Sequence, residues 1–341
     1  MGVPFKDLVH SEEISIKDLA GKKIAVDAHN TLYQFVSTIR QYDGSPLADS
    51  KGRITSHLSG LFYRTTKIMS DGVKPCFVFD GKPPVFKNNT VSTRRNAREK
   101  AREEYEQALK VEDYETARSK SMQMARLTPE MIEESKKLLK FIGVPVIQAP
   151  CEGEAQASHM CRNGDVFACV SQDYDSLLFK SPVLVRNLNI TGKRKIPYRN
   201  AYVNISPEMI VLKKELERLG LSQEQLIMLA ILVGTDYNPK GIFGIGPKTA
   251  YKRVKELKTF NKIFAGIEWS FDVSPKEIFD LFMNHPVTDD YSLKWEEPDD
   301  KALIKLLCSE HEFGEDRVVN ALKRVRDFNK SKSQTGLDKF F

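Results

Sequence analysis

The alternation of short apolar runs with helical segments constrains this chain most strongly. The runs are rich in Val, Ile and Phe and lie at residues 23–27, 76–80, 144–147, 166–170 and 183–186. Helical stretches at 55–69, 129–142 and 154–162 separate most of them. Strands that alternate with helices predict βαβ units and a parallel sheet. The expected fold class is therefore α/β, with a mostly parallel twisted central sheet flanked by helices.

Two parts of the chain depart from that alternation. Residues 83–126 are charged and Ala-rich, with too few apolar side chains for a core of their own, so we expect a helical insertion over the sheet. After Asn204 the sequence becomes mainly helical. Helix-start signals at 205–208 and 221–224 predict two of the helices of this second part. The basic, polar stretch 323–332 leads into a C-terminal end that we expect to be a flexible tail from residue 327.

Charge is concentrated in one segment. The whole chain has a formal net charge of +6, and residues 82–102 alone contain seven basic residues and one acid, which also sum to +6. Because the charges of the rest of the chain cancel, the single basic segment favours a phosphate-binding element. A solvated charged helix is the alternative.

Composition also excludes several classes of protein. The five cysteines form no C-x-x-C pair, so neither a disulfide framework nor a zinc ribbon is indicated, and we expect core thiols. The longest apolar run, 226–233, is far shorter than the roughly 20 residues of a membrane-spanning helix. The N-terminus lacks a secretory pattern, so the protein is expected to stay inside the cell.

Acidic residues follow the predicted strands. The candidates are Asp27, Asp80, Glu152, Glu154, Asp173 and Asp175, and Asp236 follows the apolar run 226–233. Because the carboxyl ends of the strands share one edge of an open α/β sheet, we expect the first six acids to converge there, with Asp236 as a further candidate.

Carboxylates this close together need cations, because like charges raise one another's pKa. All-oxygen ligands favour Mg²⁺ or Mn²⁺ over zinc, and the six histidines show no H-x-x-x-H spacing. Two such ions roughly 4 Å apart would activate a water and stabilise the leaving oxygen of a phosphodiester. The pattern thus predicts phosphoryl transfer to water.

Two other interpretations of the acids remain open. Each acid alone is typical of a turn or a helix cap. Asp173-Tyr-Asp175 also suits the nucleophile pair of an aspartyl-phosphate phosphatase, which would not require the remaining acids.

A set of short motifs resembles one family. They are Val-Asp27-Ala, Phe79-Asp-Gly-Lys-Pro-Pro84, Glu152-Gly-Glu-Ala155, Gln172-Asp-Tyr-Asp175, Gly234-Thr-Asp-Tyr237 and Gly244-Ile-Gly-Pro-Lys248. In this order and spacing they resemble the flap endonucleases, structure-specific 5′ nucleases, and their archaeal members most closely. The resemblance runs over residues 1–341.

The resemblance implies two magnesium ions, with Mn²⁺ as a possible substitute. Asp80 and Glu154 would bind one ion, with Asp27 and Glu152 around it. Asp173 and Asp175 would bind the second, with Asp236 nearby.

The resemblance also implies that the insertion is the family's helical arch, at about 83–126, through or under which a single-stranded 5′ flap passes. Lys87 and Arg94 match the arch residues that reach the scissile phosphate. Their seven-residue spacing would place them on one face of a continuous helix, where cations neutralise charge in the transition state. Arg95 and Arg98 are expected to add phosphate contacts.

Three further residues match DNA contacts of the family. Tyr33 matches the aromatic residue that stacks on a base next to the cut, and a core tyrosine is the alternative. Arg40 and Arg64 match residues near the DNA junction, and surface arginines are the alternative.

A glycine-rich hairpin, Gly241-Ile-Phe-Gly-Ile-Gly-Pro-Lys248, is predicted to open a helix. Backbone N–H groups near Gly244 and Gly246 can then meet a DNA phosphate without obstruction, and Lys248 and Lys252 add positive charge. In the family this helix-three-turn-helix element holds the duplex, often with a bound monovalent cation.

The last residues fit the sliding-clamp peptide, Q-x-x-hydrophobic-x-x-aromatic-aromatic. Leu337, Phe340 and Phe341 would enter an apolar pocket of the clamp, beside a hydrogen-bonded Gln334. An unstructured end with two phenylalanines is the alternative.

The sequence thus predicts one nuclease domain over 1–326, with an N-terminal nuclease region at about 1–98 and an internal one at about 116–258. A tail at 327–341 carries the clamp motif 334–341. We expect a monomeric, magnesium-dependent flap endonuclease with 5′–3′ exonuclease activity. It would act on branched DNA with a 5′ flap in replication and repair, in a cytoplasmic, nucleoid-associated location and with no membrane partner.

Competing functions are a non-catalytic adaptor that tethers DNA to the clamp, the phosphatase, and relatives that cut bubbles, four-way junctions or duplex ends. The full acid set argues against the adaptor. The basic insertion and the tail argue against the phosphatase, and the compact insertion followed by a clamp tail favours the flap enzyme by analogy.

Overall fold

The computed structural model describes all residues except 1, 42–43, 83–87, 190–192, 196–201 and 338–341. At residues 88–97, 193–195, 202–204, 329 and 331–337 it describes the backbone but not the side chains. The strands are β1 (Glu12–Glu13), β2 (Lys23–Asp27), β3 (Lys74–Phe79), β4 (Val146–Gln148), β5 (Ala168–Val170), β6 (Val183–Arg186), β7 (Lys193–Lys195), β8 (Tyr202–Asn204) and β9 (Glu208–Val211). The helices are α1 (Ala28–Thr38), α2 (Ser56–Ser70), α3 (Asn88–Lys110), α4 (Tyr114–Gln123), α5 (Pro129–Ile142), α6 (Gly153–Arg162), α7 (Asp175–Leu178), α8 (Leu212–Leu219), α9 (Gln223–Val233), α10 (Pro247–Leu257), α11 (Phe260–Phe264), α12 (Pro275–Met283), α13 (Asp300–Ile304) and α14 (Glu315–Leu337), with a 3-10 helix η1 (Ile16–Leu19) and a π-helical segment η3 (Lys305–Glu310).

The main sheet has seven strands in the order β1-β9-β6-β5-β2-β3-β4. Strands β4, β3, β2, β5 and β6 run parallel to one another, β9 is antiparallel to β6, and β1 is antiparallel to β9. The predicted mostly parallel sheet is therefore confirmed. The chain passes from β2 to β3 on one side and later places β5 on the other side of β2. This reversal is a topological switch point. In open α/β sheets, ligands bind at such a point, just beyond the carboxyl ends of the strands.

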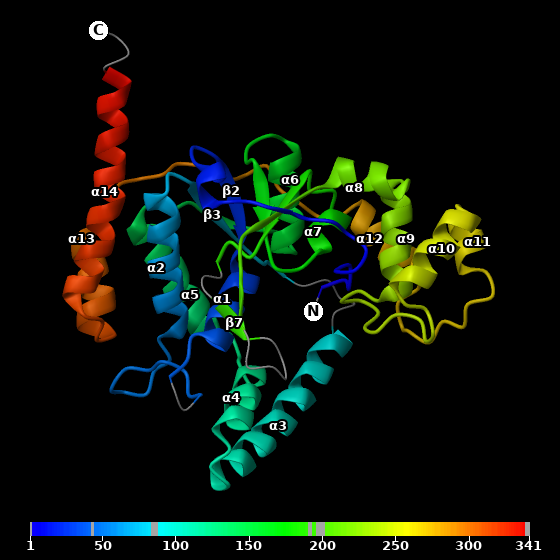
Figure 1. Cartoon of the computed structure of the whole chain (residues 1–341), viewed down its shortest axis with the longest axis horizontal. Coiled ribbons are helices and arrows are strands. Elements are labelled where there is room, and N and C mark those ends of the chain that lie inside the picture. Colours follow the sequence, from blue (N-terminus) through cyan, green and yellow to red (C-terminus); the bar gives the residue numbers. More distant parts are fainter. Residues whose placement is uncertain (1, 42–43, 83–87, 190–192, 196–201, 338–341) are drawn as a thin grey trace.

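The central strand β2 shows why both faces of the sheet are covered. Ile24 and Val26 lie on one face, in a core with α1, α2, α5 and α14. Ala25 points to the opposite face, where it packs with residues of α6. All three side chains are fully buried. An uninterrupted apolar run is what a strand between two helical layers requires. In Figure 1, α2, α5 and α14 lie on one side of the sheet and α6 on another.

Helix α9 organises the second, mainly helical part of the chain. Every residue from Leu226 to Val233 is buried, so this helix is apolar all round and lies inside a core with α8, α10 and α12. Ser222 caps it and Gln225 completes the capping box. The helix start predicted at 221–224 is confirmed. The α9–α11 region lies at one end of the molecule in Figure 1.

The helix start predicted at 205–208 is wrong. Residues Glu208–Val211 form strand β9, antiparallel to β6, and α8 begins only at Leu212. A cap followed by proline is a local signal. Here the backbone hydrogen bonds and the burial that Met209 and Ile210 gain beside β6 outweigh this local helix signal.

The insertion contains two helices that pack along each other, α3 and α4, as the sequence predicted. They project from the body of the molecule in Figure 1. Asp113 caps α4, because its side chain accepts a hydrogen bond from the Thr116 N–H at 3.0 Å. The role of this pair as an arch over DNA stays a prediction.

The C-terminal helix is longer than expected. Helix α14 continues to Leu337, so the segment 327–337, predicted to be a flexible tail, has a helical backbone. Val318, Ala321, Leu322 and Val325 recur at helical spacing and pack in the core shared with α2, which nucleates the helix. No proline follows to stop it.

Two expectations from composition can be compared with the structure. All five cysteines are unpaired, and four of them are buried. No helix in the part of the chain that the structure describes is long and apolar enough to cross a membrane.

Candidate active site

Asp27 and Asp80 lie at the carboxyl ends of the neighbouring strands β2 and β3. Asp27 ends β2 and caps α1, since its Oδ1 accepts a hydrogen bond from the Asn30 N–H at 3.1 Å. Asp80 follows β3, and its Oδ1 accepts from the Gly153 N–H at 2.7 Å. A Cβ at Gly153 would lie 2.8 Å from that oxygen. Glycine therefore allows the start of α6 to approach Asp80.

Asp173 and Asp175 lie after β5, on the other side of β2. Asn30 Nδ2 donates to Asp173 Oδ2 at 2.9 Å, so the start of α1 contacts both Asp27 and Asp173. The Val3 N–H donates to Asp175 Oδ1 at 2.8 Å. A Cβ at Gly2 would lie only 2.5 Å from Asp173 Cβ. The N-terminal segment therefore lies directly against these acids.

Glu152 and Glu154 come from the first turn of α6. Glu152 is the N-cap residue, and its Oε1 accepts a hydrogen bond from the Tyr237 hydroxyl at 3.1 Å. Glu154 Oε1 is buried and has no hydrogen-bond partner among the described residues. The positive end of the α6 dipole offsets part of the cost of two acids at this position.

Electrostatic effects show that these acids face one another. Burial, and then the charge of Asp80, raise the pKa of Asp27 well above its ordinary value. Burial, and then the charge of Asp175, raise the pKa of Glu154 well above its ordinary value. Each shift has the same physical cause, a carboxylate that has lost water and lies beside another carboxylate.

Asp236 belongs to the same group. Burial, followed by the charges of Asp173 and Asp236, raises the pKa of Asp175 to about 8. Asp236 follows α9, which the core holds against α7. The sheet edge and the helical part of the chain therefore supply acids to one place, which we call the carboxylate edge: Asp27, Asp80, Glu152, Glu154, Asp173, Asp175 and Asp236.

The donor set of the carboxylate edge fits hard divalent cations, because it contains only oxygen ligands. The buried Glu154 Oε1 would gain a partner in such a cation. No three His, Cys, Asp or Glu side chains among the described residues form a compact ligand set. The acids thus share one edge of the sheet, where their charges raise one another's pKa.

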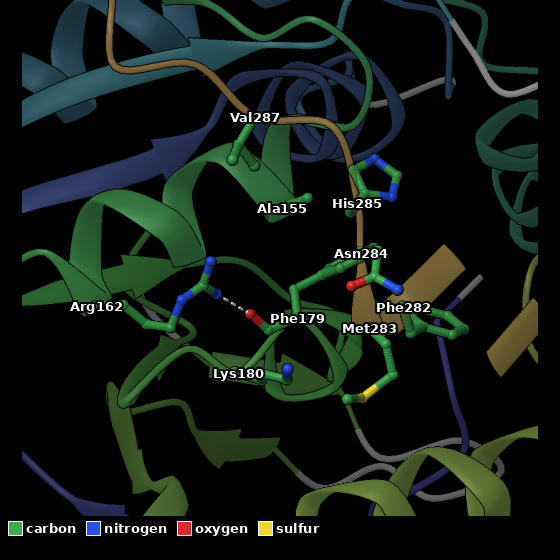
Figure 2. A pocket seen from close by; sticks show the side chains of 9 residues that line it. All are labelled: Ala155, Arg162, Phe179, Lys180, Phe282, Met283, Asn284, His285 and Val287. Carbon is green, nitrogen blue, oxygen red and sulfur yellow. Dashed lines mark hydrogen bonds between the residues drawn. The ribbon is translucent and has the colours of Figure 1, made fainter. Parts of the chain in front are cut away.

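A small pocket lies behind the carboxylate edge, between α6, α7 and the segment after α12 (Figure 2). It is lined by Ala155, Arg162, Phe179, Lys180, Phe282, Met283, Asn284, His285 and Val287. The Glu152 N–H donates to His285 Nε2 at 3.4 Å, and the His285 ring meets Phe179 edge-on at a centroid distance of 4.9 Å. None of the seven acids lines this pocket, so its walls support the start of α6.

Three predicted DNA contacts have different surroundings. Tyr33 lies on α1 with 42% of its surface exposed, so it is not a core tyrosine. The Arg40 guanidinium donates to carbonyls inside the protein, including those of Val36 and Gly44. Arg64 is half-buried on α2, burial lowers its pKa, and it has no partner among the described residues. Arg40 is therefore engaged in the protein, while Tyr33 and Arg64 are available.

The basic residues of the insertion are only partly described. Arg94, Arg95 and Arg98 lie on the backbone of α3, and of their side chains only that of Arg98 is described, as partly exposed. Lys87 lies outside the described residues. The roles of Lys87 and Arg94 stay predictions.

The glycine-rich segment forms the predicted hairpin between α9 and α10. Gly246 is the N-cap of α10, and Gly244 has φ +78°, a left-handed conformation that favours glycine. A Cβ at either glycine would meet nothing within 4 Å. Lys248 and Lys252 are exposed on the first turns of α10. The hairpin thus offers open backbone and positive charge on one element.

The clamp motif lies at the limit of the described chain. Gln334 and Leu337 are on the backbone of α14, with side chains outside the description, and Phe340 and Phe341 lie outside the described residues.

Several supporting residues were not predicted. Besides Asn30 and Val3, His29 contacts Asp80, whose N–H donates to His29 Nδ1 at 3.0 Å. His29 and Asn30 directly follow Asp27, so the rule that a strand-ending acid caps the next helix could have found them. Val3 carries no such signal, because it lies 172 residues from Asp175 in the sequence.

Known proteins resemble this chain over its whole length. The profile described as the XPG N-terminal domain matches residues 5–101, and that of the XPG I-region matches residues 143–236. Flap endonuclease 1 of Pyrococcus abyssi is 54% identical over 341 residues, covering 100% of this chain and 98% of the relative. That of Pyrococcus furiosus is 52% identical over 341 residues, covering 100% and 99%.

Solved structures agree with these relatives. Flap endonuclease-1 from Methanococcus jannaschii superposes with a TM-score of 0.77 at 42% identity, covering 97% of this chain and 100% of that one. The catalytic core of Rad2 in complex with DNA substrate has a TM-score of 0.72 at 23% identity, covering 95% and 100%, which shows a shared fold. All seven acids of the carboxylate edge fall within the two matched regions. The chain therefore belongs to the flap endonuclease family.

Proposed function

We propose that this protein hydrolyses a DNA phosphodiester near the base of a 5′ flap, leaving a 3′-hydroxyl and a 5′-phosphate. It would do so in Okazaki-fragment maturation and repair, and it would also degrade 5′ ends exonucleolytically. The observation that carries the proposal is the carboxylate edge, in which acids from several elements raise one another's pKa. Such an arrangement costs stability unless cations bind to it, which is typical of a functional site.

Two magnesium ions, or manganese as a substitute, are the cations we propose. Asp80 and Glu154 would hold one, with Asp27 and Glu152 around it, and Asp173 and Asp175 the other, with Asp236 nearby. When bound, the ions would supply Lewis-acid polarisation of the scissile phosphodiester and a more acidic water.

The protein's own residues fix the positions of these acids. Asn30 bridges Asp27 and Asp173, and the Val3 N–H holds one oxygen of Asp175. The Tyr237 hydroxyl holds Glu152. Because each donor orients a carboxylate before any cation arrives, less conformational entropy is lost on binding.

The DNA would lie across the carboxylate edge. The exposed Tyr33 ring is available to stack on a base next to the cut, and Arg64 to bind a phosphate. Lys87 and Arg94 would reach the scissile phosphate from the insertion, and Arg95 and Arg98 would add phosphate contacts. The hairpin glycines and lysines would hold the duplex, with a monovalent cation bound there. None of these contacts distinguishes bases, so the substrate is a DNA shape.

The C-terminal motif 334–341 would tether a monomeric enzyme to a sliding clamp. An apolar residue and two aromatic residues at this spacing form one helical turn that fits an apolar pocket. The α14 backbone already reaches Leu337.

The testing experiment is cleavage of end-labelled 5′-flap, blunt-duplex and single-stranded oligonucleotides with Mg²⁺ or with EDTA. We expect magnesium-dependent cutting confined largely to the flap junction and abolished in Asp175→Ala. Glu268→Gln is the matched control, because Glu268 is an exposed acid far from the carboxylate edge in sequence and on a different element.

Each alternative has its own result. Tight flap binding without cleavage would favour a clamp-tethering adaptor. A preference for blunt or single-stranded DNA would be consistent with the proposed metal site but would contradict the proposed flap specificity. Hydrolysis of small phosphomonoesters that needs Asp173 but not Asp80 would favour a phosphatase.

A further inference from the structure

Phe243 is exposed to an unusual degree. Its relative accessibility is 102%, the highest among the exposed large hydrophobic side chains of the described residues. It lies at the tip of the hairpin between α9 and α10. The flanking Ile242 and Ile245 point the other way and pack against the core around α9 and α10. The core therefore anchors the hairpin on both sides of Phe243 and leaves its ring in water.

The surroundings of Phe243 indicate what would cover it. Gly244 and Gly246 are open on their outer side, where an added Cβ would meet no atom within 4 Å. Gly246 gives α10 no side-chain cap and Pro247 has no N–H, so the N–H groups of Lys248 and Thr249 are the ones that an anion could meet at this helix start. Exposed lysines at 240 and 248 flank the tip. A ligand with both phosphates and apolar edges complements this surface.

Duplex DNA has these two properties side by side, because deoxyribose rings line the minor groove between two rows of phosphates. A protein partner could cover the Phe243 ring without using the open glycine backbone or the lysines. The ring of Phe243 is fully exposed beside that backbone, so it can enter the groove when the backbone meets a phosphate.

We propose that Phe243 is a positioning residue that packs its ring against sugar edges in the minor groove of the duplex held by the hairpin. The inference rests on the proposed function of the hairpin in holding duplex DNA. It adds an apolar contact to a site where only glycine backbone and lysine charge were expected.

An apolar contact has a signature that distinguishes it from an ionic one. Each lysine–phosphate contact releases counterions and steepens the fall of log affinity with log salt by about 0.9. A phenyl ring releases none. Removal of Phe243 should therefore weaken binding equally at every salt concentration, whereas removal of a lysine should weaken it most at low salt.

The experiment measures binding of the full-length protein to a fluorescent 5′-flap DNA in EDTA at several salt concentrations. For Phe243→Ala we expect about tenfold weaker binding, typical of one buried aromatic contact, with an unchanged salt slope. Phe243→Leu should recover part of the loss.

Two variants separate this inference from the function on which it rests. Lys248→Ala should lower the salt slope by about one unit, and Val319→Ala, which removes an exposed apolar side chain on α14, should change nothing. If Phe243→Ala binds like wild type while Lys248→Ala is impaired, the hairpin holds DNA and our inference about Phe243 is wrong. If neither variant is impaired, the hairpin does not hold the duplex and both proposals fail. A changed salt slope in Phe243→Ala would also overturn the apolar contact.

Discussion

The protein contains two groups of acids that differ in their partners. At the carboxylate edge, acids lie beside acids, and the pKa of Asp175 rises to about 8. The second group, which we call the histidine cluster, consists of His57, Glu134, His311 and Asp49 and joins α2, α5, the end of η3 and the loop before α2. There each acid lies beside a cationic or donor group.

The contacts of the histidine cluster are complementary. His57 Nε2 lies 3.0 Å from Glu134 Oε2, and His311 Nε2 lies 3.4 Å from Glu134 Oε1. The hydrogen bond with His57 lowers the pKa of Glu134. Burial alone would raise the pKa of Asp49, but hydrogen bonds from the backbone and side chain of Arg53 lower it below its ordinary value.

The difference separates acids that stabilise the fold from acids that need a ligand. Paired carboxylates with lowered pKa add to the free energy of unfolding at neutral pH. Opposed carboxylates with raised pKa subtract from it. A site that costs stability is expected to persist where it binds something, so we expect a ligand at the carboxylate edge.

The largest expected effect is loss of cleavage when the carboxylate edge is broken. Asp175→Asn should lower the single-turnover rate by about 10³-fold, since it removes charge that must hold cations against the phosphodiester. In EDTA the same variant should unfold at a higher temperature than wild type, because one opposed charge is gone. Quenched-flow cleavage and calorimetry measure the two effects. A variant that kept a tenth of the wild-type rate would contradict the assignment of Asp175.

Breaking the histidine cluster should have the opposite pattern. His57→Ala should lower the free energy of unfolding by about 3 kcal/mol, because it leaves a cavity and removes the partner of Glu134. Cleavage at a temperature where the variant is folded should be unchanged. Denaturant titration measures the stability, with His10→Ala, at an exposed histidine, as the control. Equal losses in the two variants would show that the cluster is not stabilising.

Magnesium should stabilise the protein through the carboxylate edge alone. At 100 times its dissociation constant, one bound ion adds about 2.7 kcal/mol to the free energy of unfolding. We expect this gain in wild type and in His57→Ala, and a smaller one in Asp175→Asn. Thermal unfolding with Mg²⁺ or EDTA measures it, and an undiminished gain in Asp175→Asn would place the cation elsewhere.

The smallest effect concerns acid pH. The pKa of Glu134 is lowered from an ordinary 4.5, so its contribution to stability is present above pH 4.5 and is lost as pH falls through the lowered pKa. Glu134→Gln should therefore be less stable than wild type at neutral pH and lose less stability below pH 4.5. Urea unfolding across this pH range checks the slope. Glu133→Gln, at an exposed neighbour, is the control and should follow wild type.

Several features could be predicted because they depend on local patterns. Strand β2, strand β6 and helix α5 have the expected bounds, since apolar runs, proline at a helix start and glycine at its end act over a few residues. The clustering of acids followed from one topological rule about the edge of a parallel sheet. The hairpin followed from its glycines.

The errors came from contacts between distant residues. The start of β9 carries a helix signal, but pairing with β6 decides its structure. The hydrogen bonds of Arg40 to the Gly44 carbonyl and the Ser121 hydroxyl were not expected either, and its role near the DNA junction stays a prediction. Helix α14 extends because its apolar stripe packs on α2.

The sequence by itself determined the fold class, the identity of the acids and the open hairpin, because periodicity and turn chemistry are properties of neighbouring residues. Only the tertiary structure decided which charges oppose one another and which are paired. It brought Val3 to Asp175, and His311 to Glu134, across the molecule. Burial and distance set the pKa of a carboxylate, and both exist only after the chain has folded.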